Sequence, residues 1–121
     1  LKDNHIDFSG GIPPAVERVV AYLKANNLDL KIEVETRNIE DVKEVLKVGQ
    51  VHRIMLDNFT PEQITPALEL IGGKYETEAS GGITLENVEA YAKTGVDYVS
   101  VGAIIHHAVS LDLSLKAVIH P

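Results

Sequence analysis

Two acidic side chains, Glu35 and Asp57, follow the strand-like stretches "KIEV" and "HRIML" and lie 22 residues apart. Carboxylates in such positions can hold sugar hydroxyls or a hard cation such as Mg²⁺. Lys2, near the start of the chain, can meet an anionic substrate as a point charge. Each residue also has an ordinary explanation, because Lys2 and Glu35 can simply be solvated and Asp57 can begin the turn before Thr60.

Two glycine-containing stretches indicate a second kind of chemistry. Glycine allows backbone conformations and close approaches that other residues do not, and free N–H groups at the start of a helix suit a phosphate. Both stretches can equally need glycine only for a tight turn or for packing. The residues concerned are Ser80, Gly81 and Gly82 of "EASGGI", and Val101, Gly102 and Ala103 of "VSVGA".

Helix-ending glycines and expected strand ends both recur at a regular interval along the chain. Gly49, Gly72 and Gly95 each follow a helical pattern and are spaced by 23 residues. The expected strand ends recur at 22 to 23 residues, which is typical of repeated βα units. They lie near Glu35, Asp57, Ser80 and Gly102.

Apolar periodicity and turn residues predict the elements that carry these positions. Asn38 is expected to cap one helix, Thr60 and Gln63 to form a capping box on the next, and Thr84 to cap a third. Besides a strand that ends in "LKDNH", the expected strands are 31–35, 52–58, 75–79 and 97–105. The expected helices are 12–27, 39–48, 61–71, 85–94 and 110–119.

Strands that alternate with helices predict an α/β fold with a parallel sheet and right-handed crossovers. Five such units can form part of a (β/α) barrel, which usually needs eight strands, or an open doubly wound sheet. In a barrel the chemistry takes place at the carboxyl ends of the strands. The four polar strand ends would then share one rim, which favours a functional site over four unrelated coincidences.

Composition restricts the possible functions. The 121 residues carry a formal net charge of −7, which argues against binding nucleic acid or an anionic membrane surface. The sequence has no cysteine, so disulfides and thiolate chemistry are excluded. Its five histidines have no recognisable metal-ligand spacing.

We see no signal peptide and no apolar run that could span a bilayer, and expect a cytoplasmic enzyme. Because the chain begins at Leu1, we expect it to be the C-terminal portion of a longer protein.

Six motifs together resemble the quinolinate phosphoribosyltransferase family. They are "LKDNH", "IEVE", "IMLDN", "EASGGI", "YAKTGVDYVSVGA" and "LDLSL", in this order. The resemblance implies an N-terminal sandwich domain and early barrel strands that lie outside residues 1–121, and a C-terminal incomplete TIM-like barrel to which this chain contributes. It also implies transfer of a phosphoribosyl group from phosphoribosyl pyrophosphate to quinolinate, with release of pyrophosphate and CO₂. The product is nicotinate mononucleotide, and the reaction needs Mg²⁺.

The resemblance also implies roles for individual residues. Lys2 would contact the carboxylates of quinolinate. Glu35 and Asp57 would hold the ribose hydroxyls, directly or through Mg²⁺, and stabilise the cationic transition state. The 5′-phosphate would lie against the backbone amides of Ser80, Gly81 and Gly82 and of Val101, Gly102 and Ala103. Glu78 would brace the rim beside the first of these turns.

The sequence departs from the family pattern in two respects. Ile105 and His107 replace a hydroxyl residue and a serine-like residue, which leaves no role to assign to either position. The basic motifs that grip quinolinate are absent from these 121 residues. Two alternatives therefore remain, a paralogue linked to molybdenum transport that acts on another base, and a half-barrel fragment without activity. The family also implies a homodimer.

Overall fold

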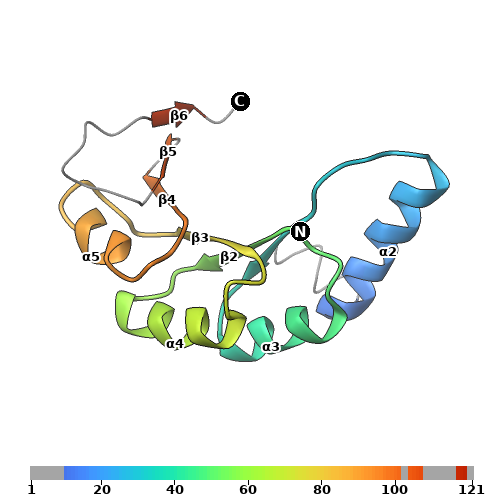
Figure 1. Cartoon of the computed structure of the whole chain (residues 1–121), viewed down its shortest axis with the longest axis horizontal. Helices are drawn as coiled ribbons and strands as arrows, with labels where there is room; N and C mark the ends of the chain where they lie inside the picture. Colours follow the sequence, from blue (N-terminus) through green and yellow to red (C-terminus); the bar gives the residue numbers. More distant parts are fainter. Residues whose placement is uncertain (1–9, 102–103, 108–116, 120–121) are drawn as a thin grey trace.

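A computed structural model of the chain describes residues 10–101, 104–107 and 117–119 (Figure 1). The helices are α2 (Ile12–Ala25), α3 (Ile39–Val48), α4 (Pro61–Ile71) and α5 (Val88–Ala92). The strands are β1 (Glu33–Thr36), β2 (Arg53–Asp57), β3 (Glu76–Ser80), β4 (Tyr98–Val101), β5 (Ile104–His107) and β6 (Ala117–Ile119). Up to β4 the elements follow the predicted alternation of strands and helices.

Local capping signals determine where α3 and α4 begin and end. The Asn38 side chain accepts a hydrogen bond of 2.8 Å from the Asp41 N–H at the start of α3. Thr60 and Gln63 form both bonds of the predicted capping box on α4. The glycine that ends α4, Gly72, adopts the left-handed conformation that favours this residue. The predicted ends of these two helices are thus confirmed.

The strands form one sheet in the order β1-β2-β3-β4-β5-β6. The first four pair in parallel, as predicted. β5 pairs antiparallel with β4, and β6 pairs antiparallel with β5. The expected single strand 97–105 is therefore wrong, because β4 ends at Val101 and β5 runs back along it.

The expected helix 110–119 is also wrong over its last three residues, which form β6. Ala117–Ile119 pair with residues of β5 that lie 11 to 15 positions earlier. The periodicity of apolar residues within one segment does not report such a pairing. Residues 110–116 of this prediction lie outside the described residues, as does the strand expected to end in "LKDNH".

The two faces of the parallel strands differ in polarity. Val34, Ile54 and Leu56 are completely buried, and α3 and α4 run along one side of the sheet (Figure 1). Burying a side chain such as Leu56 contributes about 1.5–3 kcal/mol. Successive residues of a strand point to opposite faces, so Glu35 and Asp57 project from the other face. The site residues are thus held by a well-packed apolar layer beneath them.

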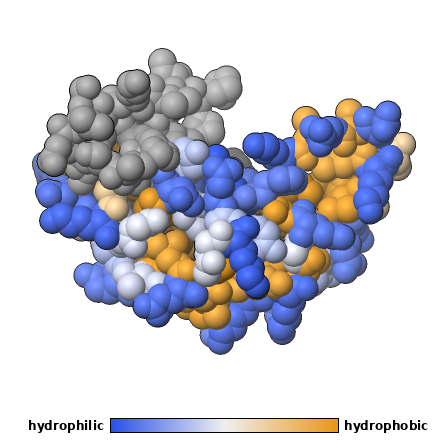
Figure 2. Space-filling model, in the orientation of Figure 1, coloured by the Kyte–Doolittle hydropathy of each residue, from blue (hydrophilic) through white to orange (hydrophobic). Residues whose placement is uncertain are grey.

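Apolar side chains are exposed around α2 and the segment that follows it (Figure 2). Tyr22 is 62% exposed and Leu30 is 59% exposed. Within the part of the chain that the structure describes, the helices are too short or too polar to cross a membrane.

Candidate functional site

The register of the strands places several predicted site residues next to one another. Glu35 lies on β1 opposite Met55 of β2. Asp57, two residues beyond Met55, lies opposite Ser80 of β3. The Asn58 N–H donates a hydrogen bond of 2.8 Å to the Ser80 carbonyl, which continues this pairing past the end of β2. The two carboxylates therefore project from adjacent strands, on one face, near the carboxyl end of the sheet.

The turn after β3 is packed directly against the end of β2. Gly81 has a φ of +88°, and a Cβ atom there would lie 3.0 Å from the Asn58 nitrogen, from Asn58 Oδ1 and from Asp57 Oδ1. Only glycine meets both demands, a positive φ and an approach this close. Gly82 also has a positive φ, of +70°. The Asp57 carboxylate thus lies at close range to Gly81.

Asn87 holds the far end of this turn. Its Nδ2 donates to the Gly82 carbonyl over 3.0 Å, and its Oδ1 accepts from the Thr84 N–H over 2.7 Å. The helix that follows, α5, begins only at Val88, and Asn87 occupies the N-cap position. The predicted helix 85–94 with a Thr84 cap is therefore too long. The Gly81–Gly82 turn is separated from this helix, so a ligand there would meet the amides of the turn.

The remaining predicted site residues fall into two groups. Val101 is the last residue of β4, as expected for a strand end. Lys2, Gly102 and Ala103 lie outside the described residues, as does the side chain of Ile105. The structure therefore brings together Glu35, Asp57, Ser80, Gly81 and Gly82, and does not place the rest.

Sequence reasoning missed a partly buried ionic network on the same face of the sheet. Arg53 Nη1 lies 3.3 Å from Glu78 Oε1, and Arg53 Nη2 lies 3.6 Å from Glu76 Oε2. The guanidinium carbon also lies 4.3 Å from the centre of the Tyr98 ring. Ser100 Oγ donates to Glu78 Oε2 over 2.9 Å. The alternation of charged residues in "RIMLD" and "ETEAS" was the available signal, since it places them on the face of Asp57 and Ser80.

Two groups near this network have altered acidity. Burial, a hydrogen bond with Glu78 and the negative charge of Glu78 raise the pKa of Glu33 from 4.5 to about 7. A hydrogen bond with Glu76, with burial as the next cause, raises the pKa of Tyr98. This face of the sheet therefore holds its negative charges close together, with Arg53 among them.

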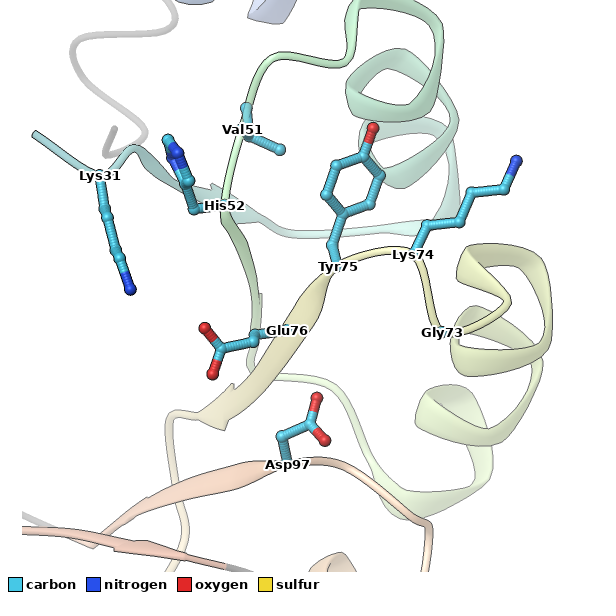
Figure 3. Close-up of a pocket in the computed structure, with 8 residues that line it drawn as sticks. All are labelled: Lys31, Val51, His52, Gly73, Lys74, Tyr75, Glu76 and Asp97. Carbon is cyan, nitrogen blue, oxygen red and sulfur yellow. The ribbon is translucent and has the colours of Figure 1, made fainter. Parts of the chain in front are cut away.

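A cavity of about 450 Å³ lies at the opposite end of the strands (Figure 3). It is lined by the segments that lead into the strands, including Lys31, His52, Tyr75 and Asp97. In barrels of βα units the amino ends of the strands serve stability, whereas the carboxyl ends carry chemistry. We therefore assign the site to the rim around Asp57. Among the described residues, no cluster of three or more His, Asp or Glu side chains could hold a metal ion alone.

Comparison with known proteins identifies the family. Residues 1–116 match the family described as the quinolinate phosphoribosyl transferase C-terminal domain. The chain belongs to the quinolinate phosphoribosyltransferase family. It is 45% identical to the chloroplastic, carboxylating nicotinate-nucleotide pyrophosphorylase of Arabidopsis thaliana, over 96% of this chain. It is 42% identical, over 98% of its length, to a probable nicotinate-nucleotide pyrophosphorylase of a Synechocystis strain.

Solved structures of nicotinate-nucleotide pyrophosphorylases have the same fold. The protein from Ehrlichia chaffeensis matches 84% of this chain with a TM-score of 0.76 and 39% identity. The protein from Francisella tularensis matches 97% of it with a TM-score of 0.75 and 35% identity. The predicted fold class, βα repeats from an incomplete barrel, is confirmed. This quinolinate phosphoribosyltransferase domain covers 37% of the Arabidopsis relative and 35% of the Ehrlichia chain.

Proposed function

We propose that this chain carries the ribose- and phosphate-binding half of a quinolinate phosphoribosyltransferase site. The observation that carries the proposal is the close approach of Gly81 to Asp57, where a carboxylate and a glycine turn face one another on adjacent strands. Membership of the family supports it. The complete protein would join phosphoribosyl pyrophosphate to quinolinate and yield nicotinate mononucleotide, pyrophosphate and CO₂, a step of NAD biosynthesis.

In this mechanism Glu35 and Asp57 act on the ribose. Positive charge builds on the ribose as its bond to pyrophosphate breaks, and the ring nitrogen of quinolinate forms the new bond. Carboxylates fixed beside that charge stabilise the transition state more than the ground state. The apolar layer beneath β1 and β2 holds both groups in place before the substrate arrives. No covalent intermediate with the protein is needed.

The two carboxylates also fit a magnesium ion. Mg²⁺ prefers oxygen ligands and is commonly bound by one or two carboxylates together with substrate phosphates and water. Glu35 and Asp57 would supply these protein ligands, directly or through water. When bound, the ion would neutralise charge on the pyrophosphate leaving group.

The 5′-phosphate would bind the turn at Ser80, Gly81 and Gly82, in which both glycines have a positive φ and Gly81 lies close to Asp57. The second wall would be formed by Val101, Gly102 and Ala103. Lys2 would contact a carboxylate of quinolinate. One lysine cannot neutralise a dianion, and burying charge without partners is costly. We therefore infer that the other base-binding groups belong to the rest of the complete protein, with its N-terminal domain and early barrel strands.

The test is an assay of the complete protein with phosphoribosyl pyrophosphate and Mg²⁺, using quinolinate or nicotinate as the base. We expect nicotinate mononucleotide and CO₂ from quinolinate and little reaction with nicotinate. Turnover of a different base alone would favour the paralogue, and no turnover of any base would contradict the proposed function. The similarity to carboxylating nicotinate-nucleotide pyrophosphorylases of Arabidopsis and Synechocystis favours the first outcome.

Assembly and cellular location stay predictions. The family resemblance leads us to propose a homodimer, which sedimentation of the complete protein would test. The sequence leads us to propose a cytoplasmic location. The Arabidopsis relative is named as chloroplastic and a Nicotiana glauca relative as mitochondrial. Imaging of the tagged complete protein would decide between these compartments.

A further inference from the structure

Glu78 is a buried carboxylate whose two oxygens are held by two neighbouring strands. Its side chain is 2% exposed. Oε1 faces the Arg53 guanidinium of β2 at 3.3 Å, and Oε2 accepts the 2.9 Å hydrogen bond from Ser100 of β4. A buried charge of this kind is tolerated only when it is paired and hydrogen-bonded. One side chain of β3 thus ties together the three strands β2, β3 and β4.

These bonds lie immediately before the proposed site along the same strands. Glu78 precedes Ser80 by two residues on one face of β3, and Ser80 pairs with Asp57. Arg53 is held in turn by Glu76 at 3.6 Å and by the face of the Tyr98 ring. Any shift of β3 relative to β2 would therefore have to break charged contacts first. Such a shift would also move Gly81 relative to the Asp57 carboxylate.

We propose that Glu78 is a positioning residue: by bridging Arg53 and Ser100 it fixes the strand spacing that holds Asp57 against the Gly81 turn. The inference rests on the proposed function for the role of that spacing in catalysis. Glu78 itself touches no substrate in this account. Its effect passes through the backbone of β3 and β2, which also carries the Asn58 N–H bond to the Ser80 carbonyl.

The structure offers a matched control for the test. Glu76 contacts the same arginine, yet its side chain is 44% exposed, against 2% for Glu78. Glu78→Gln and Glu76→Gln remove the same charge from the same strand. Exposed ion pairs contribute little, whereas breaking a buried one is costly. We therefore expect only Glu78→Gln to disturb the packing of Asp57 against the Gly81 turn.

The experiment measures hydrogen–deuterium exchange and steady-state kinetics on variants of the complete protein. In Glu78→Gln we expect the Asn58 amide to exchange about tenfold faster, since a charged hydrogen bond contributes more than a neutral one. We expect kcat to fall about tenfold or more, with a smaller change in the KM for phosphoribosyl pyrophosphate. Glu76→Gln should change both quantities less than about twofold. Ser100→Ala, which keeps the ion pair, should show the Glu78→Gln effects in weaker form.

The proposal is overturned if Asn58 exchange is unchanged in Glu78→Gln, or if Glu76→Gln accelerates it equally. Should Glu78→Gln fail to fold, unchanged Asn58 exchange in Ser100→Ala would overturn it, and faster exchange there would support it. The exchange measurement does not depend on activity. A wild-type protein that forms no nicotinate mononucleotide would therefore refute the proposed function, while the exchange result would still decide the positioning role.

Discussion

Replacing Gly81 by alanine perturbs the proposed site at its closest contact. The added Cβ would lie 3.0 Å from the Asp57 carboxylate and from two atoms of Asn58, and the residue would have to keep a φ of +88°. The left-handed conformation costs an L-residue roughly 1–2 kcal/mol. To relieve the contact, the Asp57 side chain or the turn must move, and a displacement of about 1 Å in a catalytic site can cost about 100-fold in rate. We therefore expect kcat/KM for phosphoribosyl pyrophosphate to fall about 100-fold in Gly81→Ala.

Gly73→Ala separates strain from contact. Gly73 has a similar φ of +76°, but a Cβ there would meet nothing within 4 Å. It should therefore lose a similar roughly 1–2 kcal/mol of stability while its activity stays within about twofold of wild type. Kinetics of the complete protein and its thermal melting would be measured for both variants. Equal activities in the two variants would refute the idea that the approach of Gly81 to Asp57 matters for catalysis.

Three further predictions follow from individual residues. Lys2→Met in the complete protein should weaken quinolinate binding and leave phosphoribosyl pyrophosphate binding nearly unchanged; equal losses by calorimetry would refute the assignment. Glu33 has a raised pKa of about 7 against 4.5, so its contribution to stability is full below 4.5 and is lost as pH rises toward 7. The melting temperature of Glu33→Gln should therefore be higher than that of wild type at pH 8 and close to it at pH 4.5. A melting-temperature difference between variant and wild type that is the same at both pH values would contradict this. The 121-residue chain alone should lack transferase activity, while phosphate titration shifts the amide signals of Gly81 and Gly82; activity without such shifts would reverse both expectations.

Local signals were sufficient for the elements near the site. The Asn38 cap and the Thr60–Gln63 capping box depend on residues three apart, so the sequence alone defines them. The antiparallel strands β5 and β6 escaped prediction, although β5 pairs with residues of β4 that lie only three to nine positions earlier. In the run "VSVGAII" the apolar pattern continues unbroken, whereas the chain reverses direction between Val101 and Ile104.

The same distinction applies to the site. Glu35, Asp57 and Ser80 could be placed on one rim because strand ends recur with the βα repeat. The resemblance implies that Glu78 braces the rim beside the glycine turn, but the sequence does not show which residues hold it. Its partner Arg53 comes from a neighbouring strand 25 residues earlier, and only the strand register brings the two together. The ionic network around Glu78 was therefore beyond prediction from periodicity alone.

The most direct test of the proposed function is the rate at which the complete protein forms nicotinate mononucleotide when Asp57 is replaced by asparagine. The change removes the charge that we propose lies beside the ribose and keeps the shape of the side chain. Asp29→Asn, at an exposed position, serves as control. We predict that wild type and Asp29→Asn form the product from quinolinate and phosphoribosyl pyrophosphate. Asp57→Asn should lose about 100-fold or more in kcat, the scale of one electrostatic group in a preorganised site, with a melting temperature close to wild type. A wild-type protein without this activity, or Asp57→Asn turnover equal to that of Asp29→Asn, would contradict the account.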